Sequence, residues 1–178
     1  MTGLTEVKAA LLAALGEERV RDGDSERDLH SSDLSFHAPH RPDLVVYPGS
    51  TDEVSLALAL ANEHRIPVTP FGVGTSLEGH VIPIHGGISL DLSRLDRILD
   101  IAPENLTATV QAGVTRLTLE RAVGQHGLFS PVAPGAACML WRTCSRSVVP
   151  TTAAGRTEEK LLCSAMGWIV PGEPHDTA

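Results

Sequence analysis

Apolar and polar positions alternate along the first half of the chain with the periods of short helices and strands. Apolar residues recur at helical spacing over 5–15, and Gly16 follows as a residue suited to the position after a helix. The run 43–48 is largely apolar and ends in Pro48, which predicts a buried strand, and the run 66–70 predicts a second strand. Between them the pattern predicts a helix over 50–64 that opens with a capping box. Together these segments predict a β-α-β unit.

The pattern continues with a strand at 86–92 and a hairpin over 97–113 that turns at 103–105. A helix capped by Thr115 and stopped by Gly127 follows. The second arm of the hairpin has the period of a half-buried strand. Its inward positions are Leu106, Ala108 and Val110, and its outward positions are Thr107, Thr109 and Gln111. Mixed strands and few helices predict an α+β fold.

Composition adds limits on the class of protein. The chain has 178 residues, of which 42% are hydrophobic, and this is enough for one domain with a real core. No run of 18 apolar residues is present, so we expect no transmembrane segment. Acidic residues flank the first apolar stretch, where a signal peptide would be basic, so we expect a cytoplasmic protein. A net charge of −8 without Lys or Arg clusters argues against nucleic-acid binding.

The last part of the chain has a different composition from the rest. Its basic and acidic residues balance, so the negative charge belongs to the preceding residues. Every cysteine and tryptophan of the chain lies here: Cys138, Cys144, Cys163, Trp141 and Trp168. The cysteines lack C-x-x-C spacing, so we expect no zinc site and no other metal.

Candidate chemistry lies in the stretch PFGVGTSLEGH, which occupies 70–80 directly after the second predicted strand. Three glycines leave backbone N–H groups unobstructed, and Thr75 and Ser76 add hydroxyl donors, a combination that can hold a pyrophosphate without basic side chains. A surface turn is the alternative interpretation. Leu77 stands where the Rossmann fingerprint needs its third glycine, and no Gly-Lys-Ser/Thr sequence follows for a P-loop.

Over residues 28–136 the chain resembles the FAD-binding domain of the vanillyl-alcohol oxidase or PCMH type. Two motifs, PFGVGTSLEGH and VQAGVTR, carry the resemblance in the expected order, and they are most similar to D-lactate dehydrogenase (cytochrome) and glycolate oxidase flavoproteins. The resemblance implies the N-terminal part of that domain, with two small α/β subdomains built on mixed sheets. The domain would be incomplete in this chain.

The resemblance also implies which residues contact FAD. Those expected around the pyrophosphate are Pro70, Phe71, Gly72, Val73, Gly74, Thr75, Ser76, Leu77 and Gly79. Pro48 matches a position beside the adenine, although it could simply end a strand. Those matching the start of the second flavin segment are Pro134, Gly135 and Ala136. The chain then departs from the family pattern, and no catalytic residue of the family aligns. We interpret His80 as structural, and Asp91 and Asp100 as residues that orient backbone turns.

The implied function of the intact lineage is oxidation of a D-2-hydroxy acid, D-lactate or glycolate, by hydride transfer to FAD. The electron acceptor is not implied, and we expect this chain to be inactive alone. Two alternatives are a non-catalytic truncated fragment and a free-standing module that binds a flavin or another nucleotide. A nicotinamide-dependent Rossmann enzyme is disfavoured, because no acidic residue closes a tight β-α-β unit about 20 residues after the loop.

These observations divide the chain into a lead-in at 1–27, a partial FAD-binding domain at 28–136 and a tail outside the family at 137–178. Composition, motif and periodicity all change at Ala136, which predicts that the tail is the product of a shifted reading frame or is disordered.

Translation of the encoding nucleotide sequence in the other two frames checks the shifted-frame prediction. From the codons around Ala136, one frame should continue with an Asp and a Gly-Gly pair and then run into a long domain. Early stop codons in both alternative frames would contradict it, and the tail would then need an explanation as selected protein.

Overall fold

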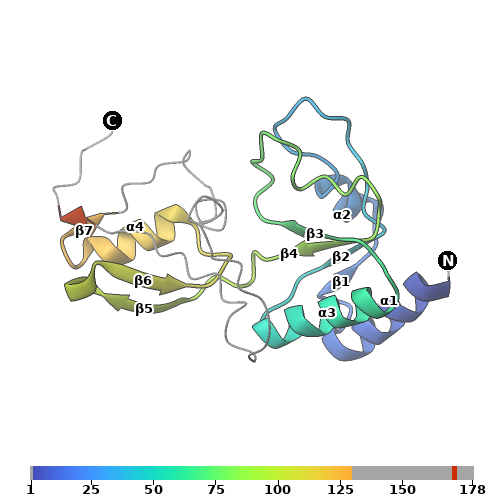
Figure 1. The fold of residues 1–178 in the computed structure, drawn as a ribbon, viewed down its shortest axis with the longest axis horizontal. Helices are drawn as coiled ribbons and strands as arrows, with labels where there is room; N and C mark the ends of the chain where they lie inside the picture. The colour runs from blue at the N-terminus through green and yellow to red at the C-terminus, as the bar shows by residue number, and fades with distance from the viewer. Residues whose placement is uncertain (1, 130–169, 172–178) are drawn as a thin grey trace. The chain divides into compact units, whose positions relative to one another are not determined.

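The computed structural model describes residues 2–129 and 170–171, and its contacts divide the chain into two compact units (Figure 1). The first unit is Met1–Arg94 and the second is Leu95–Ala178. Helices and strands occur in both units, and the four-stranded sheet of the first unit is mixed, so the predicted α+β class is confirmed. The predicted boundary at residue 136 lies outside the described residues, and the three-part division remains a prediction.

A four-stranded sheet forms the centre of the first unit, in the order β1-β2-β4-β3. Strand β1 (Val20–Arg21) runs antiparallel to β2 (Leu44–Val46). Strand β4 (Ile88–Asp91) lies parallel to β2 on one side and to β3 (Val68–Phe71) on the other. All residues of β2 and β4 are buried, which confirms the predicted burial of the first strand, whereas Phe71 alone is buried in β3. The carboxyl ends of β2, β3 and β4 therefore meet at one edge of the sheet.

Two helices of this unit, α1 (Thr2–Leu15) and α3 (Thr51–Glu63), pack against each other beside the sheet (Figure 1). A short helix, α2 (Asp24–Leu29), contacts β2. The apolar helical positions are buried: Val7 and Leu11 in α1, and Val54, Ala57 and Ala61 in α3. Their spacing of three and four residues is what brought these side chains onto one face of each helix.

The predicted start of α3 is confirmed. The Ser50 hydroxyl accepts a hydrogen bond from the Glu53 N–H at 3.3 Å, which satisfies one free donor of the first helical turn. The Glu53 carboxylate accepts the Gly49 N–H at 2.6 Å and forms an ion pair with Arg19. Glu53 thus fixes the turn between β2 and α3 rather than bonding to the backbone of Ser50. Gly16, with a φ of +84°, has the left-handed conformation expected after α1.

The second unit contains the predicted hairpin. Strands β5 (Ile98–Ala102) and β6 (Thr107–Val110) are antiparallel and joined by a turn of 3₁₀ helix, η1 (Pro103–Asn105). Helix α4 (Arg116–Gly124) follows, and β7 (Leu128–Phe129) pairs antiparallel with β8 (Val170–Pro171).

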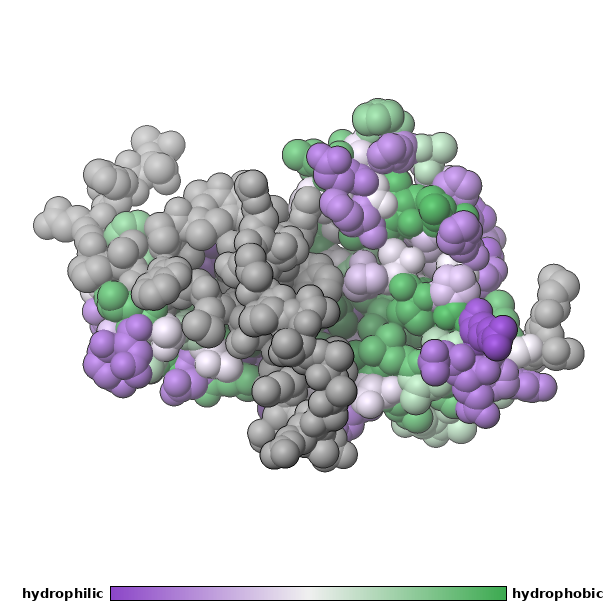
Figure 2. Space-filling model, viewed as in Figure 1, coloured by the Kyte–Doolittle hydropathy of each residue, from purple (hydrophilic) through white to green (hydrophobic). Residues whose placement is uncertain are grey.

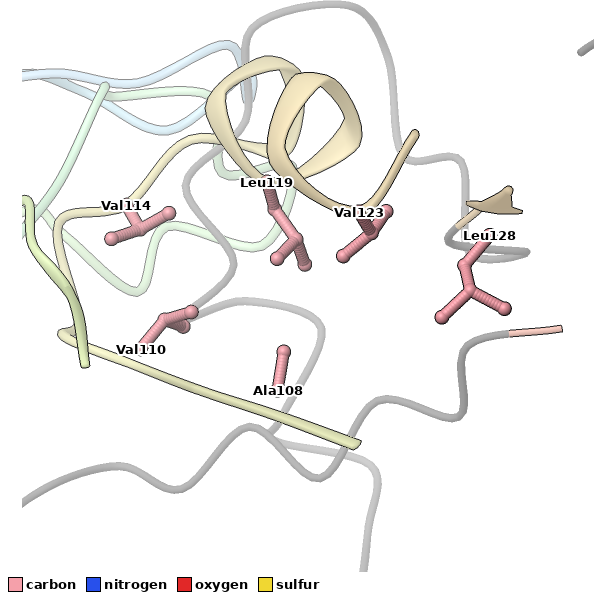
Figure 3. Close-up of a cluster of buried hydrophobic side chains, with 6 residues drawn as sticks. All are labelled: Ala108, Val110, Val114, Leu119, Val123 and Leu128. Carbon is pink, nitrogen blue, oxygen red and sulfur yellow. The ribbon is translucent and has the colours of Figure 1, made fainter. Parts of the chain in front are cut away.

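Figure 3 shows how α4 and β6 turn apolar side chains toward one another. The cluster between them consists of Ala108, Val110, Val114, Leu119, Val123 and Leu128. The Thr115 hydroxyl accepts the Thr118 N–H at 3.2 Å, so the predicted cap of this helix is confirmed. A helix whose first turn is fixed in this way presents Leu119 and Val123, four residues apart, to the strand below.

Details of this unit differ from the sequence predictions. Gln111 was predicted to face outward, but it is only 5% exposed, because its amide oxygen accepts hydrogen bonds from the N–H and Nε of Arg97 at 3.0 and 3.3 Å. Helix α4 ends before Gly127, which has a φ of +68° in the following turn. Asp100 was predicted to orient a turn, but it lies within β5 opposite Thr109. A polar residue near a hairpin can be buried against a partner or lie within a strand, and periodicity alone does not reveal that partner.

One close approach of backbone explains the glycine pair before β4. Gly87 has a φ of +77°, and a Cβ at this position would lie 2.2 Å from the carbonyl oxygen of Pro67. Its N–H donates to the Asp43 carboxylate at 2.7 Å, and its carbonyl accepts the Asp43 N–H at 2.8 Å. Only glycine fits here, so Gly87 sets how β2 and β3 enter the sheet on either side of β4.

Substitution of Gly87 by alanine tests this close approach. We expect Gly87→Ala to lower the free energy of unfolding of the first unit by about 2 kcal/mol or more, through backbone strain and the clash with Pro67. Gly23→Ala is the matched control, because Gly23 has a φ of −63° and no atom within 4 Å of the added Cβ. Urea denaturation followed by circular dichroism measures both; equal effects would contradict the assignment.

Candidate nucleotide-binding site

The glycine loop, defined as residues 72–80, leaves the sheet at the carboxyl end of β3. In doubly wound and related α/β arrangements, ligands bind outside this edge of parallel strands. In Figure 1 the loop rises beside the segment that follows α2, and the Leu34 N–H donates to the Ser76 carbonyl at 3.0 Å across the two. Pro48 is buried and follows β2 at the same edge. The fold thus brings two separate parts of the predicted site to one side of the sheet.

Two glycines of the loop have backbone conformations that favour glycine. Gly74 has a φ of +66° and Gly79 a φ of +74°. An added Cβ would lie 3.2 Å from Cζ of Phe71 at Gly74, and 2.7 Å from Cδ2 of His37 at Gly79. Gly72 is outside the left-handed region. Alternation of ordinary and left-handed residues turns successive N–H groups toward a common concave side, which suits an anion such as a pyrophosphate.

Ser76 stabilises the loop from within. It is 1% exposed, and its hydroxyl accepts the N–H groups of Glu78 and His80 at 3.3 and 3.4 Å. The same hydroxyl shares a hydrogen bond with Nδ1 of His80 at 3.2 Å, which agrees with a structural role for this histidine. In this conformation Ser76 holds the bend of the loop, and direct donation to a ligand remains a prediction.

The other predicted contact residues differ in exposure. Phe71 is only 6% exposed and belongs to β3, so its ring lies beneath the loop. Val73 and Leu77 are exposed, whereas the half-buried positions are Pro70, Gly72, Gly74, Thr75 and Gly79. Figure 2 shows apolar surface at the end of the first unit where these loops lie. The predicted second flavin segment, Pro134, Gly135 and Ala136, lies outside the described residues.

Asp33 lies in the segment after α2, close to the glycine loop. Its Oδ1 accepts the Ser35 N–H at 2.9 Å, and its Oδ2 is buried with no hydrogen-bond partner among the described residues. Burial opposes ionisation of Asp33, but nearby donors on Ser35, Ser76 and Gly79 more than offset it and hold the pKa of this carboxyl below its ordinary value of 3.8. Sequence periodicity had not singled this residue out.

Sequence analysis also missed a buried histidine. His30 is fully buried, with Nδ1 2.8 Å from the Glu26 carbonyl oxygen and Nε2 2.9 Å from Oδ2 of Asp91. The second oxygen of Asp91 accepts the Ser93 N–H at 2.8 Å, so the prediction that Asp91 orients a turn is confirmed. Nearby, burial and a hydrogen bond to the Glu26 carboxylate raise the pKa of Tyr47. Histidine occurs eight times in the chain, and nothing in the sequence marks this one as buried.

Among residues 2–129 and 170–171, no group of three or more His, Cys, Asp or Glu side chains is placed to hold a metal ion. No helix in the described part of the chain is long and apolar enough to cross a membrane.

The lowered pKa of Asp33 generates a test of loop contact against pH. A carboxyl whose pKa is lower in the folded protein stabilises it above the ordinary pKa, and this stabilisation is lost as the pH falls through the folded value. We expect Asp33→Asn to lower the melting temperature at pH 6, and the difference from wild type to vanish at acidic pH. Asp52→Asn, at an exposed position of α3, is the control. A difference that does not change with pH would contradict the role given to the carboxylate.

Comparison with known proteins identifies the family. Residues 42–140 match the family described as the FAD binding domain, which is more than half of the chain. "Probable D-lactate dehydrogenase, mitochondrial" of Danio rerio is 35% identical over 158 residues, 88% of this chain and 32% of that protein. "Glycolate oxidase subunit GlcD" of Bacillus subtilis is 42% identical over 129 residues, 72% of this chain and 27% of that protein. Because 88% of this chain aligns with the Danio rerio protein, that alignment continues beyond residue 136. That relative is named as mitochondrial, and the cytoplasmic prediction remains a prediction.

Solved structures agree on the fold. The structure described as p-cresol methylhydroxylase with substrate bound has a TM-score of 0.73 and 23% identity, covering 83% of this chain and 30% of its own. The chain spans about a third or less of the length of the curated relatives reported above. FAD is the cofactor of the matched family, and the left-handed glycines at the carboxyl edge of the sheet fit a pyrophosphate. The chain belongs to the FAD-binding domain family of oxidoreductases related to D-lactate dehydrogenase and glycolate oxidase.

Proposed function

We propose that the chain supplies the part of a D-2-hydroxy-acid oxidoreductase that holds the FAD pyrophosphate, the substrate being D-lactate or glycolate. The observation that carries the proposal is the glycine loop, whose Gly74 and Gly79 adopt left-handed conformations beside the carboxyl end of β3. Relatives named D-lactate dehydrogenase and glycolate oxidase support the substrate class. Bound FAD would supply the hydride acceptor, and the protein would supply its position.

Backbone groups carry the proposed binding of the pyrophosphate. The stretch 70–80 contains neither lysine nor arginine, and the chain has a net charge of −8. Attraction for a doubly charged group must then come from N–H groups that converge without side chains in the way, as at Gly72, Gly74 and Gly79. Thr75 would add a hydroxyl, while Phe71 and Ser76 support the loop from the buried side.

The remaining predicted contacts complete the proposed site. Pro48, at the same edge of the sheet, would lie beside the adenine. Pro70, Val73 and Leu77 would line the loop around the cofactor. The flavin side of the site depends on Pro134, Gly135 and Ala136 and on the family regions that follow them. This division predicts that the chain recognises the ADP half of FAD more strongly than the flavin half.

Three other interpretations compete with this proposal. A truncated fragment would fold in part and bind no nucleotide, whereas a free-standing module would bind FAD or another nucleotide without oxidising a hydroxy acid. Binding of NAD in preference to FAD would favour the nicotinamide-dependent alternative. Ligand binding to the folded chain is therefore the measurement that separates these functions.

We expect FAD to raise the melting temperature of the 178-residue chain, and ADP to do so as well, because both contain the pyrophosphate. At a concentration about 100 times its dissociation constant, a ligand adds about 2.7 kcal/mol to the free energy of unfolding. FMN, with one phosphate, should give a smaller shift. Differential scanning fluorimetry in matched ionic strength measures all three.

The variant Gly74→Val should remove the shift, because a β-branched side chain is strained at this φ and blocks the approach of phosphate. Gly23→Val, at an ordinary φ with open space around it, is the matched control and should retain the shift. No shift with FAD or ADP in the wild-type chain would favour the truncated fragment and count against the proposal. Full retention of the shift in Gly74→Val would remove the loop from the site.

A further inference from the structure

A buried pair of ionisable side chains lies directly beneath the glycine loop. His30, at the end of α2, is 0% exposed, and Asp91, at the end of β4, is 5% exposed. Nε2 of His30 lies 2.9 Å from Oδ2 of Asp91, and Nδ1 lies 2.8 Å from the carbonyl oxygen of Glu26. Both ring nitrogens are thus used inside the protein, and neither is left for solvent.

The two contacts fix how many protons the pair holds. A carbonyl oxygen only accepts, so Nδ1 of His30 donates to Glu26. The contact between Nε2 and Asp91 is a hydrogen bond only if one further proton lies between them, on the imidazole or on the carboxyl group. The pair therefore shares one proton and is neutral overall. Without this proton, a nitrogen lone pair would face a buried carboxylate, an arrangement that a low-dielectric interior strongly disfavours.

Aromatic packing connects this pair to the loop. The His30 and Phe71 rings have centroids 4.2 Å apart, and Cζ of Phe71 lies where a side chain on Gly74 would have to be. Phe71 is also fixed by its carbonyl, which accepts the Leu92 N–H at 3.0 Å. The ring of Tyr47 meets His30 edge-on at 5.8 Å, and its hydroxyl donates to Glu26. Both aromatic neighbours of the His30 ring are therefore themselves held in place.

We propose that His30, held by Asp91, is a positioning residue that keeps the glycine loop in the bent conformation required for the pyrophosphate. The inference rests on the proposed function of that loop. Glycines lose more conformational freedom on folding than other residues, so a loop containing three of them needs support from beneath. The ring of Phe71 transmits that support from the pair to Gly74.

Amide hydrogen exchange in the 178-residue chain without FAD tests the structural half of the proposal. The Leu34 amide, bonded to the Ser76 carbonyl, reports opening of the loop, and the Ile88 amide, bonded to Pro67, reports the far end of the same strand pair. His30→Phe keeps a ring against Phe71 but removes both nitrogens. We expect it to speed exchange at Leu34 roughly tenfold, as loss of two buried hydrogen bonds should, while Ile88 changes little.

The conservative variant Asp91→Asn is the matched control, because it removes the carboxylate but can keep the hydrogen bonds. Its amide nitrogen can donate to Nε2 of a neutral His30, while its oxygen still accepts the Ser93 N–H, so all the hydrogen bonds survive. We expect exchange at Leu34 to stay within about threefold of wild type. Exchange as fast as in His30→Phe, or equal acceleration at Leu34 and Ile88 in His30→Phe, would overturn the proposal.

The affinity for FAD tests the functional half, by fluorescence titration of the same proteins. His30→Phe should bind FAD roughly tenfold more weakly than wild type, and Asp91→Asn within about threefold of it.

Wild type that fails to bind FAD overturns the proposed function, and the exchange experiment still tests the support of the loop. Wild type that binds FAD, with His30→Phe unchanged in both measurements, overturns this inference alone. If His30→Phe does not fold, Phe71→Leu takes its place, and unchanged exchange at Leu34 in that variant overturns the proposal.

Discussion

Parallel pairing of β4 with both β2 and β3 is the constraint on which the first unit depends. It places three carboxyl ends at one edge of the sheet, and the glycine loop, Pro48 and Asp91 all lie at those ends. The pairing needs close approach of backbone at Gly87, where a side chain would strike Pro67. Residues distant in sequence therefore lie at one edge of the sheet, because three strands joined through α3 and the loop run in the same direction.

The proposed binding of an anion through backbone N–H groups depends strongly on geometry. A lysine or arginine attracts phosphate from many positions, whereas N–H groups do so only when the chain holds them convergent. Two features of the described structure support the shape of the loop: the Ser76 hydroxyl within it, and Phe71 with the His30–Asp91 pair beneath it. The polar and ionisable groups of this unit thus act mainly on the shape of the loop.

This chain aligns with only part of each curated relative. The full proposed activity would therefore need regions beyond the aligned part. Relatives named D-lactate dehydrogenase and glycolate oxidase are about three times as long as the part that aligns, or longer. The proposed division of labour is consistent with the fold: the first unit offers a nucleotide site, and the hairpin and α4 of the second unit form a separate small core. Hydride transfer would also require the flavin side of the cofactor and a substrate site.

Local pattern alone predicted α1, α3 and α4, the hairpin, the caps of α3 and α4 and the position of the glycine loop, but not α2 or β1. The predicted features depend on interactions between residues a few positions apart, so a short stretch of sequence is enough to predict them. Examples are the apolar spacing in α3, the Ser50 and Thr115 caps and the turn at 103–105. Tertiary structure alone decided that β4 enters between β2 and β3, that Gln111 is buried on Arg97, and that His30 meets Asp91 across 61 residues. Periodicity records how polar a position is but not which partner it finds, and a buried polar side chain is stabilised by a partner that only the folded chain brings within hydrogen-bonding distance.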